Sequence, residues 1–325
     1  MPINTLPTEI LLQIFLRIDP SKVFLFRRVS KRVDAILLCK YFAILSLNFY
    51  HSNTQQHTCD NTNINRSYVN LAILRKPAAI ERLITYTPTS YQNVYTEKYL
   101  KSVTRITWIL RSSSFEEATL TSPCKIPPSF GSLQHLVHLF MRGVCGSLPL
   151  EICSLQSLKL LDLSFNKELN GTIPKEIGGL TNLEFLYISH CALSGSLPKE
   201  VSGMTALKYF MLGNNQLDDC IPDSIGELMN LQGLCMERNQ ISGEIPREIG
   251  ALAKLEKSAL EGNCLCGEIP KEIAGLVELR DLSLKGNRLS GKIPPEILEL
   301  RNLQSWDLSE NTELECSFAF PLLHQ

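Results

Sequence analysis

An Ile-Pro or Leu-Pro pair returns at a nearly fixed interval between residues 126 and 294 of this chain. The steps between successive prolines are 22, 25, 24, 24, 24, 24 and 24 residues, and the prolines are Pro127, Pro149, Pro174, Pro198, Pro222, Pro246, Pro270 and Pro294. A fixed interval of this size indicates an array of stacked repeats. Because five consecutive steps are identical, each interval must correspond to one structural unit.

Alignment of the intervals gives the pattern L-x-x-L-x-L-x-x-N-x-L-S-G-x-I-P-x-x-I-G-x-L. The first leucines are Leu158, Leu183, Leu207, Leu231, Leu255, Leu279 and Leu303, and a shorter copy begins at Leu136. The L-x-L alternation predicts a short strand with one buried side. The ninth position is asparagine in six full copies and Cys191 in the other. An asparagine amide can bond buried backbone groups of its own turn and of the adjacent turn.

The second half of the pattern predicts turns. Glycine at the thirteenth position, as in Gly243, permits a turn that a β-carbon would obstruct. Proline then ends the extended segment. Apolar residues three apart after it, such as Ile225 and Leu228, fit one 3-10 or helical turn on the outer side.

No single unit of this kind buries its own apolar side, so burial comes from stacking. The expected fold is therefore an α/β leucine-rich-repeat solenoid, a curved parallel β-sheet with short 3-10 or helical outer turns. The LSGxIPxxIGxL motif resembles that of the plant-type subclass, which occurs in receptor-kinase ectodomains and polygalacturonase inhibitors. The expectation covers residues 103–316, with about eight repeats after an irregular amino-terminal cap.

Residues 1–40 have a different pattern. LPTEILLQIFLRIDPSKVFLFRRVSKRVDAILL predicts three short helices, the second starting at Asp19-Pro20 and the third capped by Ser30. Val23 to Phe26 is apolar all round one helical turn. About forty residues cannot enclose this much apolar surface, so part of it must face a partner or the next module.

This segment resembles an F-box. The resemblance rests on Leu6-Pro7-x-Glu9-Ile10, on the run from Ile14 to Leu16, and on Val29 to Arg32 before Ile36-Leu37. Proteins of that family use these elements to bind the Skp-type linker of cullin-based ubiquitin ligases. The resemblance implies that the linker contacts Leu6, Pro7, Ile10, Ile14, Leu16, Val29 and Lys31.

The expected domain order follows from these patterns. Residues 1–40 form an F-box-like three-helix module, and residues 41–102 form a linker, partly helical, to which no role is assigned. Residues 103–316 form the solenoid, and residues 317–325 form a tail.

Charge and hydropathy exclude several classes of protein. The formal net charge is −1, so no global field favours nucleic acid. One basic cluster could bind nucleic acid or act as a nuclear signal, and it consists of Arg27, Arg28, Lys31 and Arg32. A solvated or partner-facing side of the F-box helices is the favoured interpretation of this cluster. The sequence holds no uninterrupted apolar run long enough for a spanning helix and no secretory signal at its start. We therefore expect a cytoplasmic or nuclear protein whose eleven cysteines are reduced.

No pattern of catalysis or metal binding is found. The sequence holds no P-loop, HExxH, GxSxG or EF-hand motif. Cys264 and Cys266 lack a second pair at zinc-finger spacing and occupy ordinary template positions. His135 and His138 lie beside a predicted strand, where a solvent or groove role is favoured. We expect no catalytic residue, no cofactor and no metal.

Binding residues are sought at the third, fifth, seventh and eighth template positions, which face away from the core onto the expected concave surface. Stacked exposed aromatics there are typical of an interface hot spot. Ordinary surface aromatics, or cover by residues 41–102, remain the alternatives. The later repeats carry mixed charge at these positions. The expected target-binding residues are Phe140, Phe165, Phe185, Tyr187, His190, Tyr209, Met211, Glu237 and Arg238.

Two interaction modules without a catalytic site indicate an adaptor. The hypothesis is substrate recognition in a cullin-RING (SCF-type) ubiquitin ligase, with the F-box on the Skp-type linker and the concave face on a target protein. The alternatives are a protein-binding scaffold and a secreted or receptor-type recognition protein, both without a ligase role.

Overall fold

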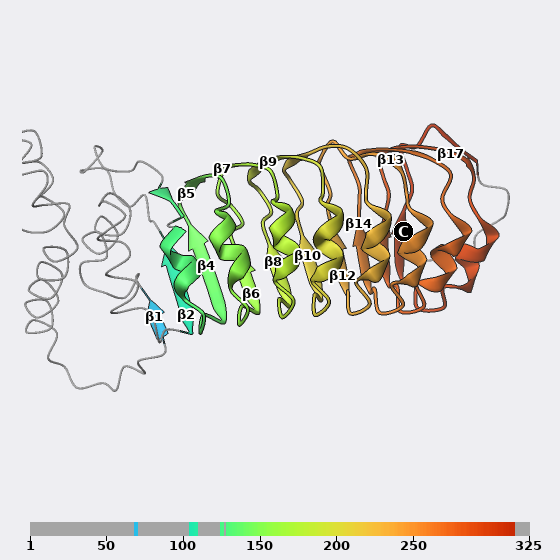
Figure 1. Cartoon of the computed structure of the whole chain (residues 1–325). Helices are drawn as coiled ribbons and strands as arrows, with labels where there is room; N and C mark the ends of the chain where they lie inside the picture. Colours follow the sequence, from blue (N-terminus) through green and yellow to red (C-terminus); the bar gives the residue numbers. More distant parts are fainter. Residues whose placement is uncertain (1–67, 71–103, 110–123, 127, 316–325) are drawn as a thin grey trace, which may run out of the picture. The chain divides into compact units, whose positions relative to one another are not determined.

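The computed structural model describes residues 68–70, 104–109, 124–126 and 128–315 (Figure 1). The expected three-helix module and the tail lie outside these residues, as does all but residues 68–70 of the linker. The chain divides into two compact units, residues 1–108 with 127–136 and residues 109–126 with 137–325. Each unit is described by itself.

In the first unit, two strands pair in parallel. Strand β1 (Tyr68–Asn70) lies against β2 (Arg105–Ile109), with Val69 opposite Ile106. A 3-10 turn, η4 (Pro128–Ser132), follows later in the sequence and buries Phe130 completely.

The second unit contains the stacked strands that the L-x-L pattern predicts (Figure 1). In chain order they are β4 (His138–Arg142), β6 (Leu160–Asp162), β8 (Phe185–Tyr187), β10 (Tyr209–Met211), β12 (Gly233–Cys235), β14 (Lys257–Ala259), β16 (Asp281–Ser283) and β18 (Ser305–Asp307). Each pairs in parallel with the next, in the same order as the repeats. The register matches template positions, so Phe185 lies opposite Tyr209 and Tyr209 opposite Gly233. This confirms the solenoid with a parallel sheet.

A 3-10 turn follows the proline of each repeat, also as predicted. These turns are η5 (Leu150–Ser154), η6 (Lys175–Gly179), η7 (Lys199–Gly203), η8 (Asp223–Glu227), η9 (Arg247–Ala251), η10 (Lys271–Gly275) and η11 (Pro295–Glu299). The preceding proline has φ between −64° and −73° in every case. Because the proline ring fixes φ near this value, it prepares the start of the turn. The isoleucine or valine inside each turn is buried, as Ile225 illustrates.

Each repeat also forms a second strand, where the sequence predicted only a turn. One sheet has the order β11 (Gln216–Leu217), β9 (Ala192–Gly195), β7 (Glu168–Gly171), β5 (Val144–Gly146) and β3 (Cys124–Lys125). The other has the order β13 (Ser242–Glu244), β15 (Cys264–Gly267), β17 (Arg288–Lys292) and β19 (Glu313–Glu315). The thirteenth-position glycine does have positive φ, +75° at Gly243 and +76° at Gly267. The glycine therefore lies in or at the end of the added strand.

The added strands form two sheets because one repeat departs from the pattern. Asp219 replaces the thirteenth-position glycine and still has a φ of 62°. Backbone bonds continue across the break, since the N–H of Gln240 donates to Leu217 O at 2.7 Å and the N–H of Ser242 donates to Asp219 O at 2.7 Å. The interruption is therefore local.

The ninth-position asparagines make the predicted bonds to backbone groups. We call this series the asparagine ladder, and Asn239 shows the pattern. Its Oδ1 accepts from the N–H of Leu217 at 3.0 Å, and its Nδ2 donates to Leu212 O at 3.1 Å and Met236 O at 3.0 Å. One amide thus satisfies backbone groups of two adjacent repeats. In the repeat with Cys191, the thiol donates to Leu163 O at 3.3 Å instead.

Candidate protein-binding face

The first sheet of the second unit has one side in the core and one side turned away from it. In β6, β8 and β10 the central residue is buried and its two neighbours are only half-buried. We call the outward side the strand face, defined by the third, fifth, seventh and eighth template positions. The nine residues expected to bind a target occupy these template positions, and their role in binding stays a prediction.

Four of these residues form an aromatic cluster, defined as Phe185, Tyr187, Tyr209 and Met211. The rings of Phe185 and Tyr209 stack with centroids 5.7 Å apart and an interplanar angle of 7°. Tyr187 tilts against Phe185 at 6.1 Å, and burial raises the pKa of its hydroxyl. A β-carbon at Gly233 would lie 2.8 Å from Tyr209 Cδ1 and 3.1 Å from Met211 Cε. The cluster therefore extends over the next repeat because that repeat has glycine at its third position.

A second group, the stacked column, consists of Phe140, Arg142, Phe165 and His190. The Arg142 guanidinium carbon lies 4.1 Å from the Phe140 ring centroid and 5.6 Å from that of Phe165. The Phe165 and His190 rings stack at 4.6 Å with an interplanar angle of 9°. The column thus alternates a cation with aromatic rings, an arrangement in which each ring face attracts the charge.

Asp162 holds Arg142 in this column. The guanidinium donates to Asp162 Oδ1 at 2.9 Å and to Oδ2 at 3.1 Å, a bidentate pair with both side chains largely buried. Sequence reasoning missed both residues. The available signal was an arginine and an aspartate on outward-facing positions of adjacent repeats, where side chains of opposite charge meet across paired strands.

The stacked column includes two strained residues. The eighth template position has positive φ in every full repeat, with 60° at Phe165, 57° at His190, 58° at Asn214, 54° at Arg238, 67° at Gly262, 63° at Gly286 and 62° at Glu310. Glycine adopts this conformation freely, whereas a side chain there costs on the order of 1 kcal/mol. Phe165 is nevertheless 63% exposed, so burial does not compensate for the strain. Since every full repeat adopts this conformation, it is a property of the repeat and not of one site.

After the aromatic cluster, the outward residues of the strand face become smaller and more buried. In β12 all three residues are buried, whereas the outward residues of β10 are not. Cys235 is 8% and Ala259 6% exposed although both point away from the core. Gly233 is buried as well, because the Tyr209 and Met211 side chains fill the space beside it.

Two carboxylates lie in the same two repeats as Cys235 and Ala259. Glu237 and Glu261 occupy the seventh position of adjacent repeats, and the Oε2 atom of each is buried without a hydrogen-bond partner. A β-carbon at Gly213 would clash with the Glu237 carboxylate, so the carboxylate occupies the space that the glycine leaves. Burial, followed by the charge of Glu261, raises the pKa of Glu237. We call these residues the glutamate pair.

The last repeats of the strand face carry paired charges. Lys285 Nζ lies 3.3 Å from Glu310 Oε1 and 3.9 Å from Asp307 Oδ2. Hydrogen bonds from Ser309 lower the pKa of Asp307. The mixed-charge surface expected there is present, and Asp307 and Glu310 both lie near Lys285.

Other expected positions lie elsewhere or outside the description. The expected linker-binding residues Leu6, Pro7, Ile10, Ile14, Leu16, Val29 and Lys31 fall outside the described residues. Cys264 and Cys266 are free cysteines on β15, the former half-buried and the latter exposed. Within residues 104–109, 124–126 and 128–315, no three His, Cys, Asp or Glu side chains gather as metal ligands. The described helices include none long and apolar enough to cross a membrane.

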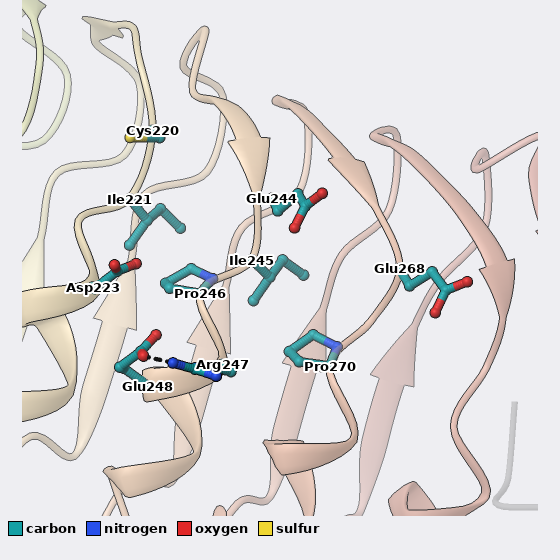
Figure 2. Close-up of a pocket in the computed structure, with 10 residues that line it drawn as sticks. All are labelled: Cys220, Ile221, Asp223, Glu244, Ile245, Pro246, Arg247, Glu248, Glu268 and Pro270. Atoms are coloured by element: carbon teal, nitrogen blue, oxygen red, sulfur yellow. Dashed lines mark hydrogen bonds and ion pairs between the residues drawn. The ribbon is translucent and has the colours of Figure 1, made fainter.

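A hollow of about 600 Å³ lies on the side of the added strands, where their two sheets are interrupted (Figure 2). Carboxylates dominate its lining, with Asp223, Glu244, Glu248 and Glu268 around one arginine. Arg247 Nε bonds Glu248 Oε1 at 3.0 Å, and its side chain is 76% exposed. The hollow is an open surface feature without the convergent polar groups of a ligand site.

Comparison with known families agrees with both modules. Residues 3–33 match the F-box domain, and residues 157–180, 182–204, 230–252 and 278–300 match the leucine rich repeat. No curated protein matches the chain. The chain thus carries an F-box domain at its N-terminus followed by leucine-rich repeats.

Similar solved structures are plant receptor ectodomains. The ectodomain of the membrane receptor kinase GASSHO1/SCHENGEN3 from Arabidopsis thaliana, in complex with Casparian strip integrity factor 2, is 30% identical with a TM-score of 0.58 and covers 71% of this chain. The Arabidopsis receptor kinase HAESA, in complex with the peptide hormone IDA and the co-receptor SERK1, is 29% identical with a TM-score of 0.56 over 70% of this chain. This chain covers only 26% and 44% of those two chains, respectively.

Proposed function

We propose that this protein is a substrate-recognition adaptor of a cullin-RING (SCF-type) ubiquitin ligase. The F-box binds the Skp-type linker, and the strand face of the repeats binds a target protein. The observation that carries the proposal is the presence in one chain of an F-box match at residues 3–33 and a repeat array with an aromatic outward face.

The strand face suits protein recognition because its aromatic groups are ordered before any partner arrives. Phe185 and Tyr209 support each other by stacking, and Arg142 is fixed between two rings by Asp162. Pre-ordered aromatic and arginine side chains lose little conformational freedom on binding, and such residues dominate interface energies.

An adaptor of this kind is not an enzyme and needs no cofactor. It increases the rate of ubiquitin transfer by holding target lysines near the ubiquitin thioester, which is a proximity effect. The ligase role places the protein in the cytoplasm or the nucleus. It requires neither binding to nucleic acid nor a membrane-spanning segment.

Binding to the linker is the first test. The purified full chain is expected to retain a purified Skp-type linker on a column, and a Leu6→Ala/Pro7→Ala/Ile10→Ala triple variant is expected to lose it. A matched control is Glu268→Gln, which changes an exposed carboxylate of the repeats. Equal retention by the wild type and the triple variant would refute the ligase role.

A receptor-type recognition protein without a ligase role is the second candidate. The similarity to plant receptor kinases solved in complex with their partners favours it. Mass spectrometry of the protein from its native source distinguishes the two. Disulfide-bonded cysteines, or glycans on Asn65 or Asn170, would support the receptor-type reading, whereas free thiols and unmodified asparagines support the adaptor.

A further inference from the structure

We propose that the strand face selects an extended target segment with a large apolar or aromatic residue followed or preceded, three to four residues away, by a lysine or arginine. The basic side chain binds at the glutamate pair, Glu237 and Glu261. This inference rests on the proposed role of the strand face in target binding and names the chemistry of the target.

The glutamate pair differs from Asp162, Glu184 and Asp307, which have cations of the chain beside them. Asp162 is bonded to Arg142, Glu184 lies between Lys159 at 3.0 Å and Lys208 at 2.7 Å, and Asp307 is near Lys285 at 3.9 Å. Within the described residues only three buried side-chain oxygen atoms lack a hydrogen-bond partner, and two of them are Oε2 of Glu237 and Oε2 of Glu261. Leaving a buried carboxylate oxygen unpaired destabilises the free protein by about 1–3 kcal/mol.

The two carboxylates are placed to share one cation. They occupy the same template position in adjacent repeats, whose strands β12 and β14 pair directly. Adjacent strands lie about 4.8 Å apart. A guanidinium fork or an ammonium group can bond both carboxylates at once when the two side chains turn their covered Oε2 atoms outward, in charge-assisted bonds roughly twice as strong as neutral ones.

A cation of the chain itself lies near the glutamate pair. Lys257, on β14, is exposed, and its charge offsets only part of the rise that burial causes in the pKa of Glu237.

The spacing of the target residues follows from the repeats. His190 lies two repeats before Glu237 along the stack, and Glu261 lies one repeat further. At about 4.8 Å per repeat, the basic group is roughly 10–14 Å from His190. An extended chain advances about 3.3 Å per residue, so about three to four residues cover this distance.

Asn214 occupies the repeat between the two sites. Its Nδ2 donates weakly to Glu237 Oε1 at 3.5 Å. An amide in this place can turn to the backbone of a segment lying across the repeats, because amides donate and accept.

The test uses the full chain and synthetic peptides. The probes are fluorescein-labelled, carboxy-amidated decapeptides of glycine and serine containing one tryptophan and one arginine, separated by one to six residues. Binding is measured by anisotropy. We expect arginine three or four residues from tryptophan to bind at least about tenfold tighter than the same peptides with glutamine or glutamate in place of arginine.

Two variants assign the parts of this preference. Glu237→Gln/Glu261→Gln is expected to lose the advantage of arginine over glutamine, while the contribution of tryptophan remains. Phe165→Ala/His190→Ala is expected to lose the contribution of tryptophan. Glu268→Gln, an exposed carboxylate on the other side of the solenoid, is expected to behave as wild type. Thermal unfolding of each variant shows that the protein is folded.

The outcomes that overturn the inference are specific. They are a preference for acidic or neutral peptides, binding that is independent of spacing, retention of the arginine preference in the glutamine variant, or self-association of the chain that this variant abolishes. Linker retention with any of these outcomes refutes the inference alone. Loss of linker retention with the arginine preference intact refutes the ligase role alone.

Discussion

Ser258 is a polar residue at a core position. Its replacement by an apolar residue is expected to increase the stability of the fold. It occupies the fourth template position between Leu234 and Leu282 of the paired strands, is 2% exposed, and its Oγ has no hydrogen-bond partner. Ser258→Leu adds apolar burial and removes the unpaired hydroxyl. Urea denaturation should show a gain of about 1–3 kcal/mol, with a smaller gain for Ser258→Ala. A loss of stability in Ser258→Leu would mean that the core has already closed around the serine.

Substitution of Glu237 is expected to raise the stability of the fold while it weakens target binding. Burial and Glu261 raise its pKa in the folded state, so the ionised form destabilises the fold at pH values above that raised pKa. As pH falls from there towards the ordinary glutamate value, the carboxylate takes up a proton and the penalty disappears. Glu237→Gln should therefore be about 1 kcal/mol more stable than wild type at pH 7 and no more stable at pH 4.

Thermal denaturation at the two pH values is the measurement, and Glu268→Gln is the control because Glu268 is exposed. A stability gain that is the same at both pH values would contradict this account.

Two truncations of Phe165, to glycine and to alanine, are expected to differ in stability. The φ of 60° at Phe165 disfavours any side chain, including that of alanine, and its ring is mostly exposed. Phe165→Gly removes the strain, so it should be about 1 kcal/mol more stable than Phe165→Ala. Both should bind the tryptophan-containing peptides equally weakly, because both lack the ring. Chemical denaturation and anisotropy test the two halves, and equal stability of the variants would remove the argument from strain.

At the scale of elements, the asparagine ladder connects each repeat to the next. Asn239 makes three buried bonds, which reach Leu217, Leu212 and Met236. Asn239→Ala should cost about 3 kcal/mol, at roughly 1 kcal/mol for each bond. Asn302→Ala is the matched control, because Asn302 makes one exposed bond to Val277 O and should lose under about 1 kcal/mol. Denaturant midpoints compare the two, and similar losses would show that the ladder is not a source of stability.

The added strands show where element prediction stopped. The Leu-Ser-Gly segment was predicted as a turn because glycine at its end has positive φ, and the φ of +75° at Gly243 bears this out. Its strand character depends on pairing with the same segment of the next repeat, as Ser242 pairs with Cys264. A strand of three residues has no periodicity of its own to detect. The L-x-L strand was predictable because leucine alternation marks its buried side.

At the scale of the whole molecule, the period of 24 residues determined the solenoid, the 3-10 turns and the amide ladder. These depend on local geometry that every repeat shares, so one sequence with internal copies contains the necessary comparison. The sequence also determined which positions face outward, and the F-box match at residues 3–33 agrees with its first forty residues.

Tertiary structure alone decided how the outward side chains meet. Arg142 and Asp162 are twenty positions apart in sequence yet form a bidentate pair, and Phe165 stacks on His190. Stacking brings equivalent positions of successive repeats to about 4.8 Å, and side-chain volume then selects partners. Glycines at 213 and 233 make room for Glu237 and Tyr209. This is why Asp162 is paired with Arg142 while Oε2 of Glu237 and Oε2 of Glu261 have no hydrogen-bond partner.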